Sequence, residues 1–454
     1  MNTPDKINPL VIAIYGLPQI SLAIIGYPLT IYLIPFYAGE LGLPLAVLGT
    51  MLFLGRMTDI ITDPIIGTLS DRTRLKSGRR KVWMFIGAFV MILGVYKLFE
   101  PVSPVSTWYF MIWLSVVFLG FTLILLPYQA WGAEISPAYE IRTRFTGSAQ
   151  FCMILGLLLA TIVPTLVSEE VTGAATREGH VMTVMSWLIY LLLPLGILTT
   201  LLFVPDRLPP KKEKNIPFLS GLKIVWHNGP FKRTMLAMFI TYAAENFRLT
   251  MTYFFARDVV GMTNIETMYL FYFLFALVTV PAWVWLANRI GKHVALMMGL
   301  ALVFIMGLAT LTLEEGDTTA LFVLFCIKGL GFGALNSLPA AMIADIVDID
   351  ELRSKEKRQG LYYAIFGFIY KFGAACGAGL APVMLAYVGF NAGGESNASA
   401  LLWVKLFYGL VPSVLILVVI RLLWRYPITR LRHKRIQERV ARLEARLEAR
   451  LENV

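Results

Sequence analysis

Charged residues are scarce in this chain. Asp, Glu, Lys and Arg make up 15% of the 454 residues, whereas soluble proteins contain about 25%. Only three cysteines and four histidines are present. The cysteines all lie in apolar runs, which argues against a disulfide framework or a cysteine-based metal site. The histidines fall in loops, at the end of a run or in the tail, so any proton coupling should run through carboxylates. No glycine-rich nucleotide-binding loop occurs, which argues against a pump driven by ATP.

Hydrophobic residues are abundant instead, at 57% of the chain. They form repeated runs of about 20 residues, the length that a helix needs to cross a bilayer. Backbone groups in hydrocarbon must be hydrogen-bonded internally, so these runs should be helices, and no cleavable signal peptide is expected before the first. About twelve spans are expected, at 10–38, 43–70, 82–101, 107–133, 144–167, 181–204, 233–257, 264–288, 293–313, 319–347, 360–389 and 400–424. The sequence therefore predicts an all-α, multi-pass membrane protein.

The net charge of +11 would suggest a nucleic-acid partner in a soluble protein. Here the basic residues gather in alternate loops, above all in 72–81, 207–233 and 353–358, and the opposite loops are acidic. By the positive-inside rule, both termini and the basic loops should be cytoplasmic. We therefore expect a lipid bilayer rather than nucleic acid around this chain. The compact architecture suggests a bacterial inner membrane.

A polar segment at 205–232 separates six spans from six. We predict an N-terminal six-helix lobe at 1–204, a cytoplasmic middle loop at 205–232, a C-terminal six-helix lobe at 233–424 and a basic tail at 425–454. Two such lobes are the layout of a secondary transporter. Apolar residues recur at helical spacing in the tail. This amphipathic helix could lie on the anionic inner leaflet, pair as a short coiled coil, or be solvated without a specific role. We otherwise expect a monomer.

A polar motif recurs after the second and eighth spans. The first copy reads Gly67-Thr-Leu-Ser-Asp71-Arg72 and then Gly78-Arg79-Arg80, and the second reads Asn288-Arg289-Ile-Gly291-Lys292. The first copy resembles the cytoplasmic loop signature of the major facilitator superfamily, with four residues inserted before Gly78. Contacts between Asp71 and the arginines would hold helices together in one conformation only, which suits a gate. The expected gating residues are Asp71, Arg72, Arg79 and Arg80.

The second span carries charges that are costly inside a membrane. Arg56, Asp59 and Asp63 lie midway along the apolar segment 43–70, and on a helix residues three and four apart share one face. That face should point at a protein interior or a watery cavity rather than at lipid. Two carboxylates can bind Na⁺ through oxygen ligands, or hold a proton when one raises the pKa of the other. We therefore expect a cation site inside a transporter; the alternative is a static cluster of buried charges.

These residues and several motifs elsewhere resemble one family, the glycoside–pentoside–hexuronide cation symporters, of which melibiose permease is the familiar member. The motifs are Gly55-Arg56-x-x-Asp59-x-x-x-Asp63-Pro64, the loop ending Gly78-Arg79-Arg80, Leu126-Pro127-Tyr128 before Ala133-Glu134-Ile135-Ser136, Ala344-Asp345-Ile-Val-Asp348, and Lys371 with Gly373. The resemblance covers most of the chain. It implies a major facilitator superfamily fold that works by alternating access.

The resemblance also implies roles for single residues. Asp59 and Asp63 match the carboxylates that bind the coupling cation, Na⁺ or H⁺, and Thr62 and Thr122 match positions beside them. Lys371 matches a lysine linked to both cation and sugar, and it could compete with the cation for either carboxylate. We therefore expect Asp59, Asp63, Thr62 and Thr122 in the cation site, and Lys371 and Arg56 as coupling residues.

The match fails at the sugar site of melibiose permease. The acidic positions of its first and fourth spans correspond here to Ala23 and Leu125, its fourth-span tryptophan to Gln129, and an arginine of its fifth span to Ala149 or Gln150. A sugar pocket needs convergent hydrogen-bonding groups, which Ala23 and Leu125 cannot supply. Cation coupling is therefore supported, and galactoside recognition is not.

Other polar groups could bind the solute. The candidates are Gln19, Tyr128, Gln129, Glu245, Asn246, Arg248, Lys328 and Asn336. Glu245 and Arg248 could simply pair with each other, or could meet an anionic or zwitterionic solute. We predict symport of a sugar or glycoside-type solute with Na⁺ or H⁺, with no enzymatic activity and no cofactor besides the ion. The alternatives are a carrier of an amphiphile, such as the lysolipids that some animal relatives carry, or of a charged metabolite, and a non-transporting scaffold or receptor.

Overall fold

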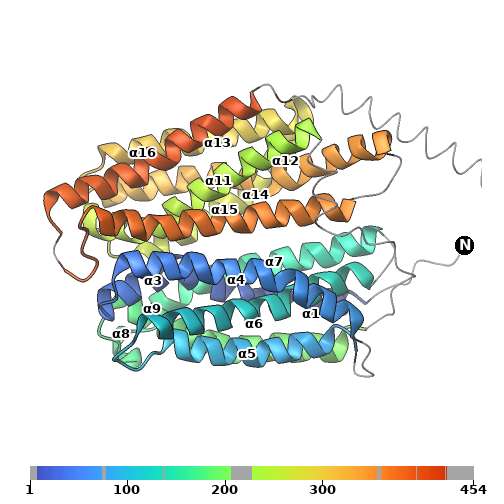
Figure 1. The fold of residues 1–454 in the computed structure, drawn as a ribbon, viewed down its shortest axis with the longest axis horizontal. Coiled ribbons are helices and arrows are strands. Elements are labelled where there is room, and N and C mark those ends of the chain that lie inside the picture. The colour runs from blue at the N-terminus through green and yellow to red at the C-terminus, as the bar shows by residue number, and fades with distance from the viewer. Residues whose placement is uncertain are drawn as a thin grey trace, which may run out of the picture. The chain divides into compact units, whose positions relative to one another are not determined.

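The computed structural model describes residues 8–73, 78–135, 139–205, 228–354, 359–394, 396–424 and 426. The regular structure in these ranges is helical throughout (Figure 1). The helices are α1 (Pro9–Gly16), α2 (Pro18–Ile31), α3 (Leu33–Pro35), η1 (Phe36–Glu40), α4 (Leu45–Arg72), α5 (Lys81–Phe99), α6 (Thr107–Glu134), α7 (Tyr139–Leu166), α8 (Glu169–Thr172), α9 (Arg177–Phe203), α11 (Gly229–Phe254), η2 (Phe255–Val259), α12 (Ile265–Ile290), α13 (Lys292–Ala309), η3 (Thr310–Thr312), α14 (Thr318–Ser354), α15 (Gln359–Tyr387) and α16 (Ala398–Leu423). Most of the predicted middle loop and almost all of the predicted tail helix lie outside the described residues.

Eleven stretches among the described residues are helical, long and apolar enough to cross a membrane. They match eleven of the expected spans, and the remaining expected span corresponds to α11. Glu245 and Arg248 near its middle make α11 more polar than the others. Large apolar side chains such as Phe89 and Leu202 are 63% and 75% exposed, which suits helices that face lipid. The chain is an integral, multi-pass membrane protein, as predicted.

The first expected span, 10–38, is not one continuous helix. It consists of α1, α2, α3 and the π-helical turn η1. Pro18 opens α2, where its missing N–H is tolerated, and Pro28 and Pro35 remove further backbone donors. The sequence pattern alone predicts the length of this span and misses its breaks.

Several of the described helices begin at side chains that cap them. The hydroxyls of Ser106 and Thr176 accept hydrogen bonds at 3.1 Å from backbone N–H groups at the start of α6 and α9. Asn397 does the same for α16, at 2.7 Å. Such caps satisfy donors that the first turn of a helix leaves without intrahelical partners. They fix where these helices start, and so where the charges of their first turns lie.

The chain divides into two compact units. The first comprises Met1–Lys212, Phe247–Phe273 and Ala378–Val404, and the second comprises Glu213–Asn246, Leu274–Gly377 and Lys405–Val454. Within the first unit α6 packs against both α4 and α5 (Figure 1). Within the second unit α13 packs along α14, and their apolar faces form part of one core. The predicted division into lobes at 1–204 and 233–424 stays a prediction.

Candidate functional site

Helices α4 and α6 bring three of the predicted cation-site residues together. The Thr122 hydroxyl on α6 donates a hydrogen bond to Asp59 Oδ1 and lies 3.1 Å from Asp63 Oδ1. Thr122 is 1% exposed, and both aspartates are half-buried. A hydroxyl carries a single proton, so it cannot donate fully to two carboxylates at once. Two carboxylates and a hydroxyl that meet at one point provide oxygen ligands, which suit a small hard cation or a shared proton.

A glycine allows α4 and α6 to approach this closely. A Cβ atom at Gly55 would lie 3.0 Å from Leu114 Cδ2 and 3.4 Å from Phe118 Cε2. Leu114, Phe118 and Thr122 are four residues apart, so they form one ridge of α6. That ridge packs against Gly55 at one end and reaches the aspartates at the other. The tight crossing therefore places Thr122 beside Asp59 and Asp63.

Arg56 and Thr62 lie on either side of Asp59 along α4. The guanidinium carbon of Arg56 is 5.7 Å from the centroid of the Phe118 ring, within the range of a cation–π interaction. The Thr62 hydroxyl donates to the backbone oxygen of Asp59 at 3.1 Å, as helical threonines commonly do. Its proton is thus engaged with its own helix. The role of Thr62 as a cation ligand stays a prediction.

An open groove with a volume of about 400 Å³ runs between α4 and α6 beside this site. Its lining residues are Thr58, Thr62, Trp108, Met111, Ile112, Ser115, Val116 and Leu119. Thr58, like Thr62, donates its hydroxyl to its own helix, at 2.6 Å from the Gly55 oxygen. The groove therefore offers mainly apolar surface, which matches an alkyl chain better than the hydroxyls of a sugar.

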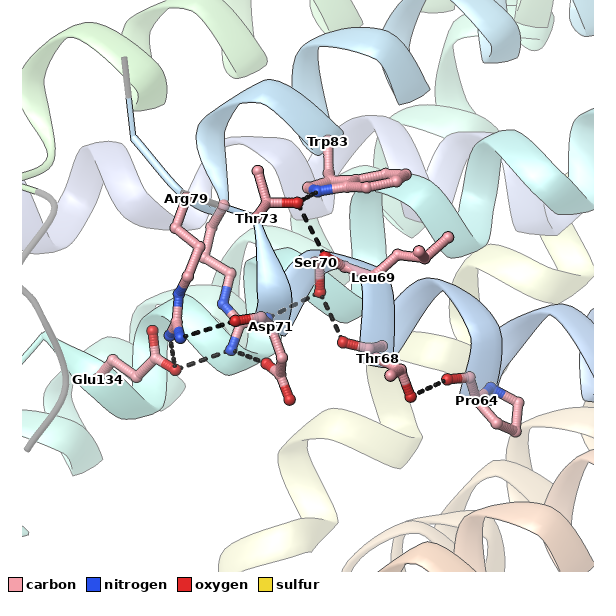
Figure 2. Close-up of polar contacts among 11 residues, drawn as sticks. Pro64, Thr68, Leu69, Ser70, Asp71, Thr73, Arg79, Trp83 and Glu134 are labelled. Atoms are coloured by element: carbon pink, nitrogen blue, oxygen red, sulfur yellow. Dashed lines mark hydrogen bonds and ion pairs between the residues drawn. The ribbon is translucent and has the colours of Figure 1, made fainter. Parts of the chain in front are cut away.

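Three of the four predicted gating residues meet at the ends of α4 and α6 (Figure 2). Arg79 and Arg80 lie 2.5 and 2.8 Å from Glu134 Oε1, and Arg80 lies 2.6 Å from Asp71 Oδ1. We call Asp71, Arg79, Arg80 and Glu134 the loop cluster. The fourth predicted residue, Arg72, is exposed at the end of α4. The cluster ties the loop before α5 to both neighbouring helices.

In the loop cluster, the attraction between opposite charges outweighs the effect of burial on Glu134. Arg80 is 4% exposed and also donates to Ser70 Oγ at 2.8 Å. Burial alone would raise the pKa of Glu134, but hydrogen bonds and charge from Arg80 and Arg79 outweigh it and hold that pKa below its usual value. Glu134 is therefore a carboxylate at neutral pH and can pair with both arginines.

A second ionic cluster lies at the start of α9. Arg177 Nε is 3.1 Å from Glu266 Oε1, and Arg257 Nη1 is 2.6 Å from Glu178 Oε1. We call these four residues the α9 clasp. The side chains of Glu266 and Glu178 are 1% and 8% exposed, and Arg257 also donates to the backbone oxygen of Ala392 at 2.9 Å. The clasp therefore joins α9 to α12, to η2 and to the loop before α16.

The two clusters lie at opposite ends of α4. Thr176, which caps α9, also donates to the carboxylate of Glu40, and Glu40 ends η1 five residues before α4 begins. The loop cluster instead contains Asp71, next to the last residue of α4. The 28 residues of α4 span about 42 Å at 1.5 Å per residue. This length is enough to cross a bilayer.

The solute candidates of the first unit occupy different environments. Tyr128 is 1% exposed, and its hydroxyl donates to the Tyr15 backbone oxygen at 2.9 Å. Tyr15 returns the same bond at 3.0 Å, and the two rings stack 4.4 Å apart. Gln19 is half-buried and Gln129 is exposed. Gln129 lies two turns beyond Thr122 on α6, so of these three it is the one on the helix face that meets Asp59 and Asp63.

In the second unit, α11 and α14 hold buried charges. Lys328 Nζ lies 3.4 Å from Glu245 Oε2, and their side chains are only 7% and 9% exposed. Arg248 follows three residues later on α11, where it belongs to the first unit, and is 1% exposed. Ionisable groups buried in membrane-spanning helices commonly mark a pathway for ions or solutes. The structure thus places three of the solute candidates on two helices.

The remaining predicted site residues are Asn246, Asn336 and Lys371. Asn246 donates to the Tyr242 backbone oxygen at 2.9 Å. Asn336 is exposed on α14, and Lys371 is half-buried near the middle of α15. Lys371 belongs to the second unit and the two aspartates to the first. Its link to them stays a prediction.

Sequence reasoning did not assign several residues that take part in these clusters. Glu134 closes the fourth span and is acidic, which was an available signal for a partner of the basic loop. In the sequence, Arg177 and Glu178 look like ordinary loop charges, and Arg257 and Glu266 look like charges at the ends of spans. Their partners lie 79 and 89 positions away. Phe118 has no polar signal and is one of 29 phenylalanines.

The chain is similar to several known membrane transport proteins. The family described as MFS/sugar transport protein matches residues 14–430. The isoprimeverose transporter of Lactiplantibacillus pentosus is 25% identical, over 84% of this chain and 81% of that protein. The sodium-dependent lysophosphatidylcholine symporter 1 of Gallus gallus is 24% identical, over 93% of this chain and 86% of that protein.

A solved structure shares the fold. It is a bacterial homolog of the human lysosomal transporter Spinster, in an inward-facing and unoccupied conformation. The TM-score is 0.63 at 12% sequence identity, and the match covers 93% of this chain and 98% of that one. This likeness confirms the predicted major facilitator superfamily fold.

Proposed function

The chain belongs to the MFS/sugar transport protein family, and from that premise we propose that it is a secondary transporter that couples a solute to Na⁺ or H⁺. One observation carries the coupling: the Thr122 hydroxyl lies between Asp59 and Asp63 inside membrane-spanning helices. Carboxylates are costly there unless a cation or proton offsets their charge. The named relatives include a sodium-dependent symporter, which supports this assignment.

Transport should proceed by alternating access between the lobes 1–204 and 233–424. The positive-inside rule puts the loop cluster and both termini in the cytoplasm, and so the α9 clasp on the other side, in what we take to be a bacterial inner membrane. Opening the end that holds the α9 clasp must break the ionic contacts of the clasp. Lys371 and Arg56 would couple the steps, because a lysine and a cation compete for the same carboxylate.

For the solute we propose a sugar or glycoside-type molecule, in keeping with the isoprimeverose transporter among the relatives. Gln19, Gln129, Asn246 and Asn336 are its candidate hydrogen-bonding partners. One observation favours a second candidate, an amphiphile such as a lysolipid: the apolar groove between α4 and α6 adjoins the cation site. Glu245 and Arg248 would then meet a charged head group or a charged metabolite. A non-transporting scaffold would gain nothing from these buried charges.

Cation binding to the purified protein tests the coupling. We expect saturable Na⁺ binding, or proton release on Na⁺ addition, that Asp59→Asn abolishes at a pH where the wild type responds. Glu315→Gln is the matched control, because Glu315 is an exposed loop carboxylate. If neither ion is bound, or if Asp59→Asn behaves like the wild type, the charges are structural and the proposal fails.

Uptake into proteoliposomes separates the two solutes. An inward Na⁺ or proton gradient should drive accumulation of either a labelled glycoside or a labelled lysolipid, and Asp59→Asn should abolish it. Accumulation of the lysolipid alone would reject the glycoside assignment. Accumulation that does not respond to any ion gradient would point to a uniporter and would refute coupling.

A further inference from the structure

A positive charge lies one turn from the proposed cation site. Arg56 precedes Asp59 by three residues and Asp63 by seven, so on α4 all three share one face. A guanidinium keeps its charge at any pH that the protein meets. If it approaches the carboxylates, it competes directly with Na⁺ or H⁺ for them. The affinity of the site therefore depends on where the guanidinium is held.

The ring of Phe118 provides such a holding point. The Arg56 guanidinium carbon is 5.7 Å from the ring centroid. Phe118 is 9% exposed, and one turn later on the same helix Thr122 contacts both aspartates. One ridge of α6 thus presents an aromatic face to the arginine and a hydroxyl to the carboxylates. Close packing at Gly55 sets the distance for both.

We propose that Phe118 is a positioning residue, whose ring holds the Arg56 guanidinium by a cation–π interaction and thereby tunes cation affinity at Asp59 and Asp63. This inference rests on the proposed function, because it assumes that the carboxylates bind a cation. The attraction depends on the negative face of the ring. Without that face, the guanidinium should lean towards the carboxylates and weaken binding of the coupling ion.

The test is the midpoint of Na⁺ or proton binding in variants of Phe118. Phe118→Leu keeps an apolar side chain but removes the ring, and it should weaken cation binding by about 2- to 30-fold. Phe118→Trp restores an aromatic face and should return the midpoint to the wild-type value or tighten it. Phe110→Leu is the matched control. Phe110 is a fully buried aromatic of α6 that packs on Tyr37, so its loss should lower thermal stability and leave the midpoint unchanged.

A double-mutant cycle separates positioning from packing. In an Arg56→Gln background, Phe118→Leu should no longer change the midpoint, because no guanidinium remains to be held. An unchanged midpoint in the single variant Phe118→Leu, or an equal loss with and without Arg56, would overturn the proposal. A wild-type protein that binds no cation would instead refute the proposed function, before Phe118 is tested.

Discussion

Replacing Glu266 by glutamine should loosen the α9 clasp. Glu266 lies in the first turn of α12 and accepts a hydrogen bond from Arg177 Nε at 3.1 Å. Glutamine keeps the shape of the side chain and removes its charge. Arg177 retains a contact with the exposed Glu169 at 3.0 Å. Because the clasp ties α9 to α12, its weakening should favour conformations in which this end of the transporter is open.

The exposure of Glu266 and Arg177 determines how much free energy the loss of their ion pair costs. Removing one partner of a buried ion pair costs about 3–5 kcal/mol, whereas exposed pairs contribute about 0–1 kcal/mol. The Glu266 side chain is 1% exposed and that of Arg177 is 25% exposed. An intermediate loss of about 1–3 kcal/mol is therefore reasonable. It corresponds to a shift of about 5- to 150-fold in the equilibrium between closed and open conformations.

Thiol labelling can measure this shift. Ala256 is fully buried beside Arg257, so Ala256→Cys, in a chain without the three native cysteines, reports opening of the clasp to a water-soluble maleimide. Glu266→Gln should raise the labelling rate by the factor above. Glu170→Gln is the control, because Glu170 is exposed near the clasp. Exchanging the charges, with Arg177→Glu and Glu266→Arg together, should bring the rate back towards that of the parent.

Unchanged labelling in Glu266→Gln would refute the clasp as a barrier to opening. An equal rise in Glu170→Gln would show that the net charge of this surface, and not the ion pair, controls access.

Two further perturbations test the α4–α6 pair and the loop cluster. Gly55→Val should press on Leu114, lower stability by about 1–3 kcal/mol and weaken cation binding. Gly67→Val is the control, because an added Cβ there meets no atom within 4 Å, and it should change neither stability nor binding. Equal effects of the two variants in thermal unfolding and cation titration would contradict the packing argument. Because the pKa of Glu134 is lowered in the folded protein, its contribution to stability is full above the unfolded value of about 4.3 and is lost as the pH falls through the folded value. Glu134→Gln should therefore lower the unfolding temperature at pH 7 and converge with the wild type in acid, and a constant difference would argue against the ionised carboxylate.

Part of the arrangement at the proposed cation site could be predicted because it depends on local geometry. Helical spacing alone places Arg56, Asp59 and Asp63 on one face, and the cost of charge in a membrane favours a functional role for that face. Thr122 was predicted through a resemblance to a family rather than from spacing. No rule of periodicity links a threonine of the fourth span to an aspartate 63 residues earlier.

The contacts of the α9 clasp and of Phe118 could not be predicted from the sequence, because they do not depend on local geometry. Their significance depends on which residues from distant helices meet, and that depends on helix packing. Arg177 and Glu178 are adjacent in sequence, yet they pair with Glu266 and Arg257 respectively. A pair of adjacent charged residues just before a membrane span indicates only topology until the partners of these residues are known. The breaks in the first span were likewise hidden, although its prolines were visible in the sequence.

The repeated motif takes on a more specific meaning once its contacts are known. In the second unit Lys292, at the start of α13, lies 2.5 Å from Asp345 Oδ1 of α14 and also donates to the Ala341 oxygen at 3.0 Å. Arg80 makes the corresponding contact with Glu134 of α6. Each copy thus ties a basic residue at the start of one helix, α5 or α13, to an acidic residue in the C-terminal part of the following long helix, α6 or α14.

The contacts of the two ionic clusters in the first unit suit these clusters to different tasks. Every contact described for the loop cluster joins elements within 1–204, so these contacts fasten neighbouring helices of one sequence half to one another. The α9 clasp instead joins that half to η2 and α12 of the other. A barrier to alternating access must connect parts of the chain that separate during transport. If the predicted lobes at 1–204 and 233–424 are the parts that separate, the clasp meets this requirement through its own contacts. The loop cluster can act as a gate only by keeping α4, α5 and α6 rigid while they move together.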